Sequence, residues 1–328
     1  MMKRRQFVLA AAMTPAAWPL AGRAQSKSAL PRIGYLNIGS AGVNGVFLDA
    51  LRDGLRELGY VDGKNVVIDV RWADGFAPAL PQLAATLVRD KPDAIVTTCI
   101  PSTRAAKQAT GTLPVVMSVD GDPVAAGLVA SLARPGANVT GTSTQFEELI
   151  PKWLELLNAA VPKVRDIAIL RNPANVGDPY FWARFEDAAR MKGVRVLPFE
   201  ARVGSDLDRA FADMSRQRAG ALIVMTEGFL ASQAQRVVPL AARHQLPAIY
   251  GFREFAEAGG LMSYGLSYRE YYRGVARYLD AVLKGTKPAN LPIEQPTKIE
   301  LVINLKTAKA LGLAIPQALL LRADEVIQ

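Results

Sequence analysis

Residues 113–141 read LPVVMSVDGDPVAAGLVASLARPGANVTG, and this stretch decides the fold class. Its first part, Leu113 to Val119, is a short apolar run rich in β-branched side chains, typical of a strand buried on both faces of a parallel sheet. Asp122 and Pro123 are residue types that begin a helix, and the apolar residues that follow at four-residue spacing predict a helix up to Pro135. A strand leading directly into a helix indicates a parallel α/β sheet, whose ligand-binding edge is the carboxyl end of the strands.

The same alternation of strand and helix runs along the rest of the chain. The expected strands are residues 32–38, 65–72, 93–98 and 114–119 in a first series, and 164–170, 194–201, 221–226 and 246–251 in a second. The expected helices are residues 47–58, 80–90 and 102–109, then 152–160, 180–192, 206–217 and 231–244. Two such series predict two α/β lobes, each a doubly wound, Rossmann-like sheet covered by helices.

The last third of the chain has too few elements for a third lobe, so we expect it to complete the other two. It contains an apolar strand, a long helix over residues 268–284 and a proline-rich link over residues 287–296. The chain would then cross between the lobes three times, near residues 138–144, 259–264 and 294–298. The predicted N-terminal lobe is residues 30–140 plus 265–293, and the predicted C-terminal lobe is residues 141–264 plus 294–328. Several crossings side by side form a natural hinge.

Residues 1–24 have the pattern of an export signal. A basic start is followed by an apolar stretch that is too short to span a membrane, and a small-x-small ending predicts cleavage after Ala24. Arg4 and Arg5, followed by Gln6 and Phe7, match the twin-arginine pattern, and an ordinary secretory signal with adjacent arginines is the alternative. We therefore expect a periplasmic protein.

Charge and composition exclude several classes of function. The formal net charge is +9, and four of these charges leave with the signal, so no basic footprint for nucleic acid remains. The chain has one cysteine, Cys99, and one histidine, His244, and neither lies in a catalytic signature. We expect no metal site, no cofactor and no enzyme activity. The glycine-rich loop over residues 39–45 lacks the spacing of a dinucleotide fingerprint.

Polar residues follow the predicted strands of both lobes. Because the carboxyl ends of parallel strands share one edge, these side chains would project into one cleft between the lobes. The candidate ligand-binding residues are Ser40, Thr98, Asp120, Asp122, Asn172, Thr226 and Tyr250. Hydroxyls and helix-start N–H groups suit a carboxylate, an aspartate suits an ammonium, and a tyrosine ring could cover an apolar body. Capping is the alternative role for each polar residue, and it is favoured for Asp122.

Long segments resemble the periplasmic substrate-binding components of ABC transporters of the TrpX-like kind. They are residues 3–7 (KRRQF), 54–75 (GLRELGYVDGKNVVIDVRWADG), 121–141 (GDPVAAGLVASLARPGANVTG), 241–265 (AARHQLPAIYGFREFAEAGGLMSYG) and 295–316 (QPTKIELVINLKTAKALGLAIP). The resemblance implies a type I periplasmic binding fold that closes around a small molecule. It also implies an amino acid or a related small carboxylate as the ligand, an inner-membrane permease as the partner, and a monomer.

Two other functions stay open from the sequence. One is an exported ligand sensor that reports to a membrane receptor. The other is an exported nicotinamide-dependent oxidoreductase, which the twin arginines favour because that route carries folded proteins with their cofactors.

Overall fold

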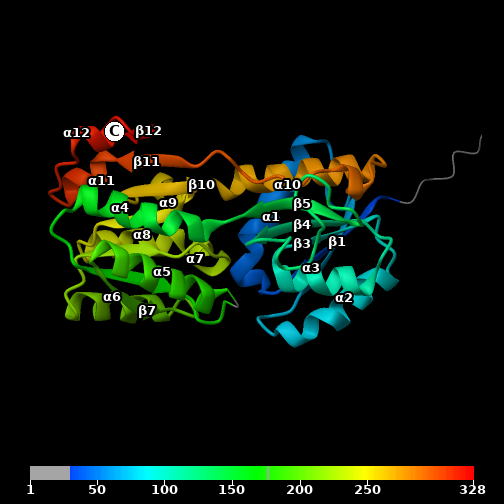
Figure 1. Cartoon of the computed structure of the whole chain (residues 1–328), viewed down its shortest axis with the longest axis horizontal. Helices are drawn as coiled ribbons and strands as arrows, with labels where there is room; N and C mark the ends of the chain where they lie inside the picture. The colour runs from blue at the N-terminus through cyan, green and yellow to red at the C-terminus, as the bar shows by residue number, and fades with distance from the viewer. Residues whose placement is uncertain (1–29, 176) are drawn as a thin grey trace, which may run out of the picture. The chain divides into compact units, whose positions relative to one another are not determined.

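The computed structural model describes residues 30–175 and 177–328, so the predicted export signal lies outside the described residues. The described chain forms two mainly parallel sheets, one of five strands and one of seven, with helices packed against them (Figure 1). We call the five-stranded sheet with its helices the first lobe, and the seven-stranded sheet with its helices the second lobe. The α/β class with two doubly wound sheets is confirmed.

The first sheet has the strand order β2-β1-β3-β4-β5, and all neighbouring strands in it are parallel. The strands are β1 (Arg32–Asn37), β2 (Val67–Trp72), β3 (Ala94–Thr97), β4 (Val115–Asp120) and β5 (Val139–Thr144). All residues of β3 are buried, as its unbroken apolar pattern predicts. The helices are α1 (Ala41–Glu57), η1 (Ala77–Ala79), α2 (Leu80–Arg89), α3 (Ile100–Ala109), α10 (Tyr268–Leu283) and η3 (Pro288–Asn290).

The second sheet has the order β12-β11-β10-β9-β8-β6-β7, and only β10 and β11 pair in antiparallel fashion. Its strands are β6 (Asp166–Arg171), β7 (Arg195–Glu200), β8 (Ala221–Val224), β9 (Ala248–Phe252), β10 (Met262–Leu266), β11 (Glu300–Asn304) and β12 (Glu325–Ile327). Its helices are η2 (Phe146–Leu149), α4 (Ile150–Ala160), α5 (Asp178–Lys192), α6 (Asp206–Arg216), α7 (Gly228–Ser232), α8 (Ala234–Arg243), α9 (Arg253–Glu257), α11 (Leu305–Ala310) and α12 (Gln317–Leu320). The order β7-β6-β8-β9-β10 repeats the order β2-β1-β3-β4-β5 of the first sheet.

The chain passes between the two lobes at three places. It leaves the first sheet after Thr144, returns after Leu266 so that α10 packs on α1 (Figure 1), and leaves again after Glu294, which pairs with Thr142 of β5. The predicted lobe boundaries after residues 140 and 264 fall inside β5 and β10, so these two changes of lobe come a few residues later than predicted. The strands extend past the ends of their apolar runs because a glycine or a polar residue can still form backbone hydrogen bonds with the neighbouring strand.

The helix predicted after Asp122 is absent, and residues 121–134 form turns. Gly127 adopts a φ of +69°, a left-handed conformation that stops the first turn. Arg104 of α3 donates to the Ala126 carbonyl at 3.0 Å, and Lys107 donates to the next two carbonyls at 2.9 Å each. Because side chains of a neighbouring helix satisfy these carbonyls, the segment needs no helical hydrogen bonds.

Gly141 of β5 lets this strand pack closely against β4. It adopts a φ of +131°, and a Cβ atom at this position would lie 2.1 Å from the carbonyl oxygen of Met117 on β4. Only glycine fits here, because any side chain would collide with the backbone of the neighbouring strand.

Candidate functional site

The start of α1 lies directly after β1 and presents free helix N–H groups. Asn37, at the end of β1, is fully buried; its Oδ1 accepts from the Gly39 N–H at 2.7 Å, and its Nδ2 donates to the Tyr35 hydroxyl at 3.1 Å. These bonds fix the loop that leads to Ser40, which is the N-cap residue of α1 but makes no side-chain capping bond. The first turn of α1 contains no acidic residue. This helix start is therefore able to accept an anionic group.

The start of α3 is already satisfied by its own side chains. The N–H groups of Thr98 and Cys99 both donate to the Ser102 hydroxyl at 3.2 Å, and the hydroxyls of Thr97 and Thr103 lie 2.7 Å apart. Burial raises the pKa of the Cys99 thiol, so the thiol is neutral and a poor nucleophile. Thr98 is partly buried at the end of β3. It is the residue of this turn whose hydroxyl remains for a ligand.

Asp120 and Asp122 have different surroundings despite their closeness in sequence. Asp120 ends β4, and its Oδ1 accepts from the Thr144 hydroxyl at 3.1 Å and from the Phe146 N–H at 3.3 Å. Burial, together with the nearby Glu147 carboxylate, raises the pKa of Asp120 to about 7. Asp122 is exposed, and its Oδ1 accepts from the N–H groups of the next two non-proline residues at 2.7 and 3.1 Å. Asp122 therefore caps a turn.

The second lobe brings Asn172, Thr226 and Glu227 together at the ends of β6 and β8. Asn172 is buried, and its Nδ2 donates to Glu227 Oε2 at 3.4 Å. Glu227 is the N-cap of α7 and accepts from the Leu230 and Phe229 N–H groups at 2.5 and 3.1 Å. Burial raises its pKa to about 7.

The sequence places Glu227 directly after a predicted strand, next to Thr226, but it is not among the candidate ligand-binding residues, and its burial and its bond to Asn172 are not marked by its local sequence. Thr226 beside it packs tightly on β9. A Cβ atom at position 251 would lie 2.0 Å from Thr226 Cγ2, so Gly251 is needed there.

Tyr250 does not lie at the end of its strand. Strand β9 continues to Phe252, and Tyr250 is 1% exposed with its ring stacked on Phe255 at a centroid distance of 4.7 Å. It is a core residue of the second lobe, so the prediction that its ring lines the cleft is wrong. Phe252 takes the terminal position, and its ring packs edge-to-face on Phe146 at 5.5 Å and on Phe47 of α1 at 6.2 Å.

Helix α1 of the first lobe meets α7 of the second lobe. Gly228 begins α7, and a Cβ atom there would lie 2.2 Å from Asn44 Nδ2 and 3.1 Å from a ring carbon of Phe47. Glu227 and the first turns of α1 are therefore neighbours. This contact joins the helix that follows β1 of the first sheet to the helix that follows β8 of the second sheet.

Charged side chains near these strand ends have protein partners. Arg171 at the end of β6 is paired with the buried Asp178, and its guanidinium lies 4.8 Å from the ring centre of Trp182. The Tyr180 hydroxyl donates to Glu147 at 3.3 Å. Within residues 30–175 and 177–328, no group of three or more His, Cys, Asp or Glu side chains is placed to hold a metal ion. The donors and acceptors present suit an organic ligand that carries both charges.

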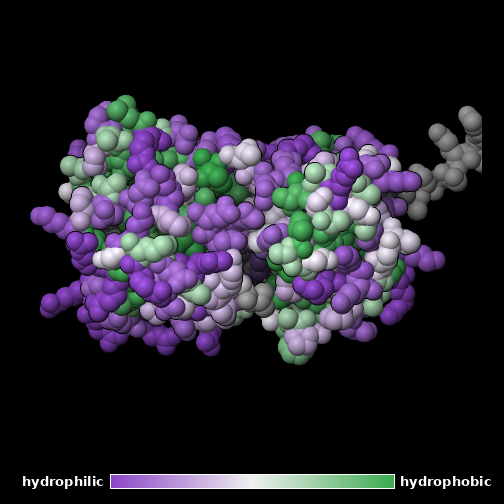
Figure 2. Space-filling model, in the orientation of Figure 1, coloured by the Kyte–Doolittle hydropathy of each residue, from purple (hydrophilic) through white to green (hydrophobic). Residues whose placement is uncertain are grey.

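Hydrophilic side chains cover most of the face shown in Figure 2, and its hydrophobic areas are small and separated. Across the part of the chain that the structure describes, no helix combines the length and the apolar character needed to cross a lipid bilayer.

Residues 45–327 match the family model of the ABC transporter substrate binding protein. A tyrosine-binding protein of Clostridioides difficile (strain R20291) is 30% identical over 267 residues, which are 81% of this chain and 75% of that protein. The solved structure of a conserved domain protein from Vibrio cholerae has a TM-score of 0.74 at 27% identity, and covers 91% of this chain and 100% of its own.

The structure of an ABC domain from Streptococcus pneumoniae in complex with L-Trp has a TM-score of 0.72 at 28% identity, with the same coverage of both chains. These similarities agree with the two-lobed α/β architecture and extend over both lobes. The chain belongs to the family of ABC transporter substrate-binding proteins, and its fold is that of a type I periplasmic binding protein.

Proposed function

We propose that the protein captures an amino acid or a related aromatic carboxylate between its lobes and delivers it to an inner-membrane ABC permease. The observation that supports this proposal is the contact of α1 in the first lobe with α7 in the second, which places Gly228 beside Asn44 in a chain of this family. Two of the similar proteins named above, one described as a tyrosine-binding protein and one solved in complex with L-Trp, support an amino-acid ligand here. The protein would act in the periplasm as a monomer, without catalysis.

Each charged end of an amino acid has a plausible partner. The ligand carboxylate would lie at the start of α1 near Ser40, where helix N–H groups and the hydroxyl can donate. The ligand ammonium would lie near Asp120, whose two hydrogen bonds both use Oδ1 and leave Oδ2 as an acceptor. Thr98, Asn172 and Thr226 would complete the polar contacts, and Phe47 is the nearest aromatic ring for an apolar side chain.

A thermal-shift screen of residues 25–328 tests the proposal. The panel is L-tyrosine, L-tryptophan, the other amino acids, benzoate-type carboxylates, purines, sugars and nicotinamide cofactors. A ligand at one hundred times its Kd stabilises the fold by about 2.7 kcal/mol, which gives a visible rise in Tm. Stabilisation by amino acids or aromatic carboxylates alone is the expected result. Stabilisation by nicotinamide cofactors alone would overturn the proposal, and a mass spectrum of the purified protein controls for a ligand already bound.

A further inference from the structure

The first crossing between the lobes is held by a carboxylate of the first lobe. The chain leaves β5 at Thr144, passes through Gln145 and enters η2 at Phe146. Asp120, at the end of the neighbouring strand β4, accepts from the Thr144 hydroxyl and from the Phe146 main-chain N–H. One side chain therefore bonds to both sides of the single residue at which the chain changes lobe.

The second crossing is held in the same way from the second lobe. The chain leaves β10 at Leu266 and enters α10 at Tyr268. Glu254 of α9 is 7% exposed, and its Oε1 accepts from the Ser267 hydroxyl at 2.7 Å and from the Arg269 main-chain N–H at 3.3 Å. Its Oε2 is buried and has no hydrogen-bond partner among the described residues. The two bonds again lie on either side of one residue, here Tyr268.

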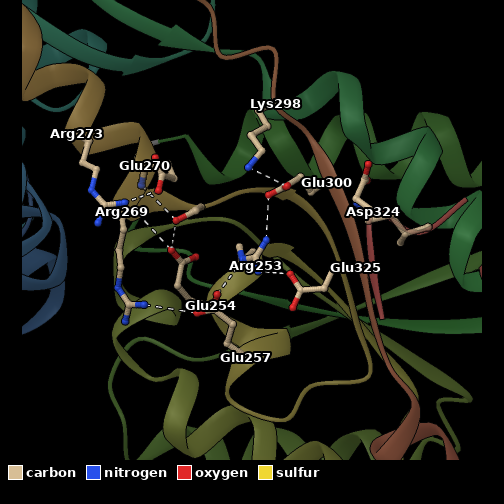
Figure 3. A network of polar contacts seen from close by, with 12 residues as sticks. Arg253, Glu254, Glu257, Arg269, Glu270, Arg273, Lys298, Glu300, Asp324 and Glu325 are labelled. Carbon is tan, nitrogen blue, oxygen red and sulfur yellow. Dashed lines mark hydrogen bonds and ion pairs between the residues drawn. The ribbon is translucent and has the colours of Figure 1, made fainter. Parts of the chain in front are cut away.

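The surroundings keep Glu254 in place without competing for its oxygens (Figure 3). Arg253, the preceding residue, donates to Glu257 at 2.8 Å, to Glu300 at 3.1 Å and to Glu325. Arg269 turns its guanidinium towards Glu257, and its main-chain N–H towards Glu254. Arg253 thus ties α9 to β11 and β12, the strands that the chain reaches after its third crossing.

We propose that Asp120 and Glu254 are matched positioning residues, one on each lobe, that restrain the first and second crossings and so set the equilibrium between open and closed lobes. Each accepts one hydroxyl and one main-chain N–H from residues that are two apart. Two hydrogen bonds to one carboxyl group limit the backbone torsions between their donors. These are the torsions of Gln145 at the first crossing and of Ser267 and Tyr268 at the second, where a hinge motion would act. This inference rests on the proposed function, in which ligand binding closes the lobes.

Distance measurements between the lobes test the inference without a ligand. Spin labels are placed at Ala85→Cys on α2 and Ala212→Cys on α6, both exposed, in a Cys99→Ser background, and the distance distribution is measured by double electron–electron resonance. Asp120→Ala and Glu254→Ala are each expected to broaden the distribution or add a second population. Asp120→Asn and Glu254→Gln keep the accepting oxygen and are expected to restore the wild-type distribution. Glu148→Ala, an exposed acid beside the first crossing, is the matched control.

Two further variants guard against misfolding. Thr144→Val removes the hydroxyl donor to Asp120, and Ser267→Ala removes the hydroxyl donor to Glu254 together with the cap on the Glu270 N–H. Each should broaden the distribution less than the matching alanine variant. If the alanine variants fold, by circular dichroism, but keep the wild-type distribution, the inference is wrong.

The panel of the thermal-shift screen separates this outcome from failure of the proposed function. Broadened distances with no stabilising compound would leave the hinge residues standing and remove the amino-acid proposal. Stabilisation by L-tyrosine or L-tryptophan with unchanged distances would support the amino-acid proposal and remove the hinge inference.

Discussion

The raised pKa of Asp120 predicts a stability difference that depends on pH. The folded protein holds this pKa at about 7, against an ordinary value of 3.8, because burial disfavours the charged form. The folded state therefore binds the proton more tightly than the unfolded state. The stability that this group contributes is present in full below about pH 4 and is lost as the pH rises through 7.

The size of the effect follows from the shift in pKa. A shift of about three units corresponds to an upper limit of about 4 kcal/mol. Part of the Asp120 surface is exposed, so solvent lowers the free-energy cost of ionising its carboxyl group in the folded state. We therefore expect about 2 kcal/mol. Asp120→Asn is uncharged at every pH and keeps the Oδ1 acceptor. Its stability relative to the wild type should rise by about 2 kcal/mol between pH 4 and pH 8.

Thermal unfolding followed by circular dichroism measures this difference. In a protein of this size, about 2 kcal/mol corresponds to a relative change in Tm of about 5 °C. Titrating groups that do not interact with Asp120 cancel when the variant is compared with the wild type at each pH, and Glu147 is a neighbouring group that does interact with it. Glu148→Gln, at an exposed site, should show no such dependence. A difference between Asp120→Asn and the wild type that stays constant from pH 4 to pH 8 would refute the reasoning.

Three other substitutions have defined outcomes. Gly141→Ala should lower the free energy of unfolding by more than about 3 kcal/mol, because its Cβ would meet the Met117 carbonyl. Gly111→Ala, with open space around it, should lower it by less than about 1 kcal/mol. Urea unfolding compares the two variants. Arg253→Met should speed hydrogen–deuterium exchange in β11 and β12, while exchange in the first lobe stays at its wild-type rate. Tyr250→Phe should leave the Kd of the compound that stabilises the wild type unchanged in isothermal titration, since the hydroxyl lies in the core; a tenfold weaker Kd would return Tyr250 to the site.

The fold was largely predictable because its strands and helices are marked by local sequence. The run from Val115 to Val119 and the leucine spacing of α1 each identify one element type, and their alternation leaves only a parallel α/β arrangement. The helix predicted after Asp122 failed for a reason outside that segment. Arg104 and Lys107 of α3 satisfy its carbonyls, and the sequence of the segment does not reveal them.

The strand-end positions of most candidate residues were predictable from the sequence, but their individual contacts were not. Ser40 and Asn172 lie at strand ends as expected, because the end of an apolar run is visible in the sequence. Tyr250 was misplaced because β9 continues one residue beyond the predicted end at Gly251, to Phe252, so that Tyr250 lies inside the strand. The bond between Glu227 and Asn172 and the hydrogen bonds of Asp120 join residues 24 or more apart in the chain, which no local pattern reports.

The repeated strand order of the two sheets has a consequence for how such proteins change over evolutionary time. Each lobe has its own set of strand-end residues on its own sheet, so a ligand held between the lobes would contact two sets of residues that different sheets position. Substitutions after β6 or β8 alter one half while the packing of the other is untouched. In a lineage with this architecture, the residues of one lobe can change to fit a new ligand. The residues of the other lobe can be kept, and they continue to bind the groups that all ligands of one chemical class share.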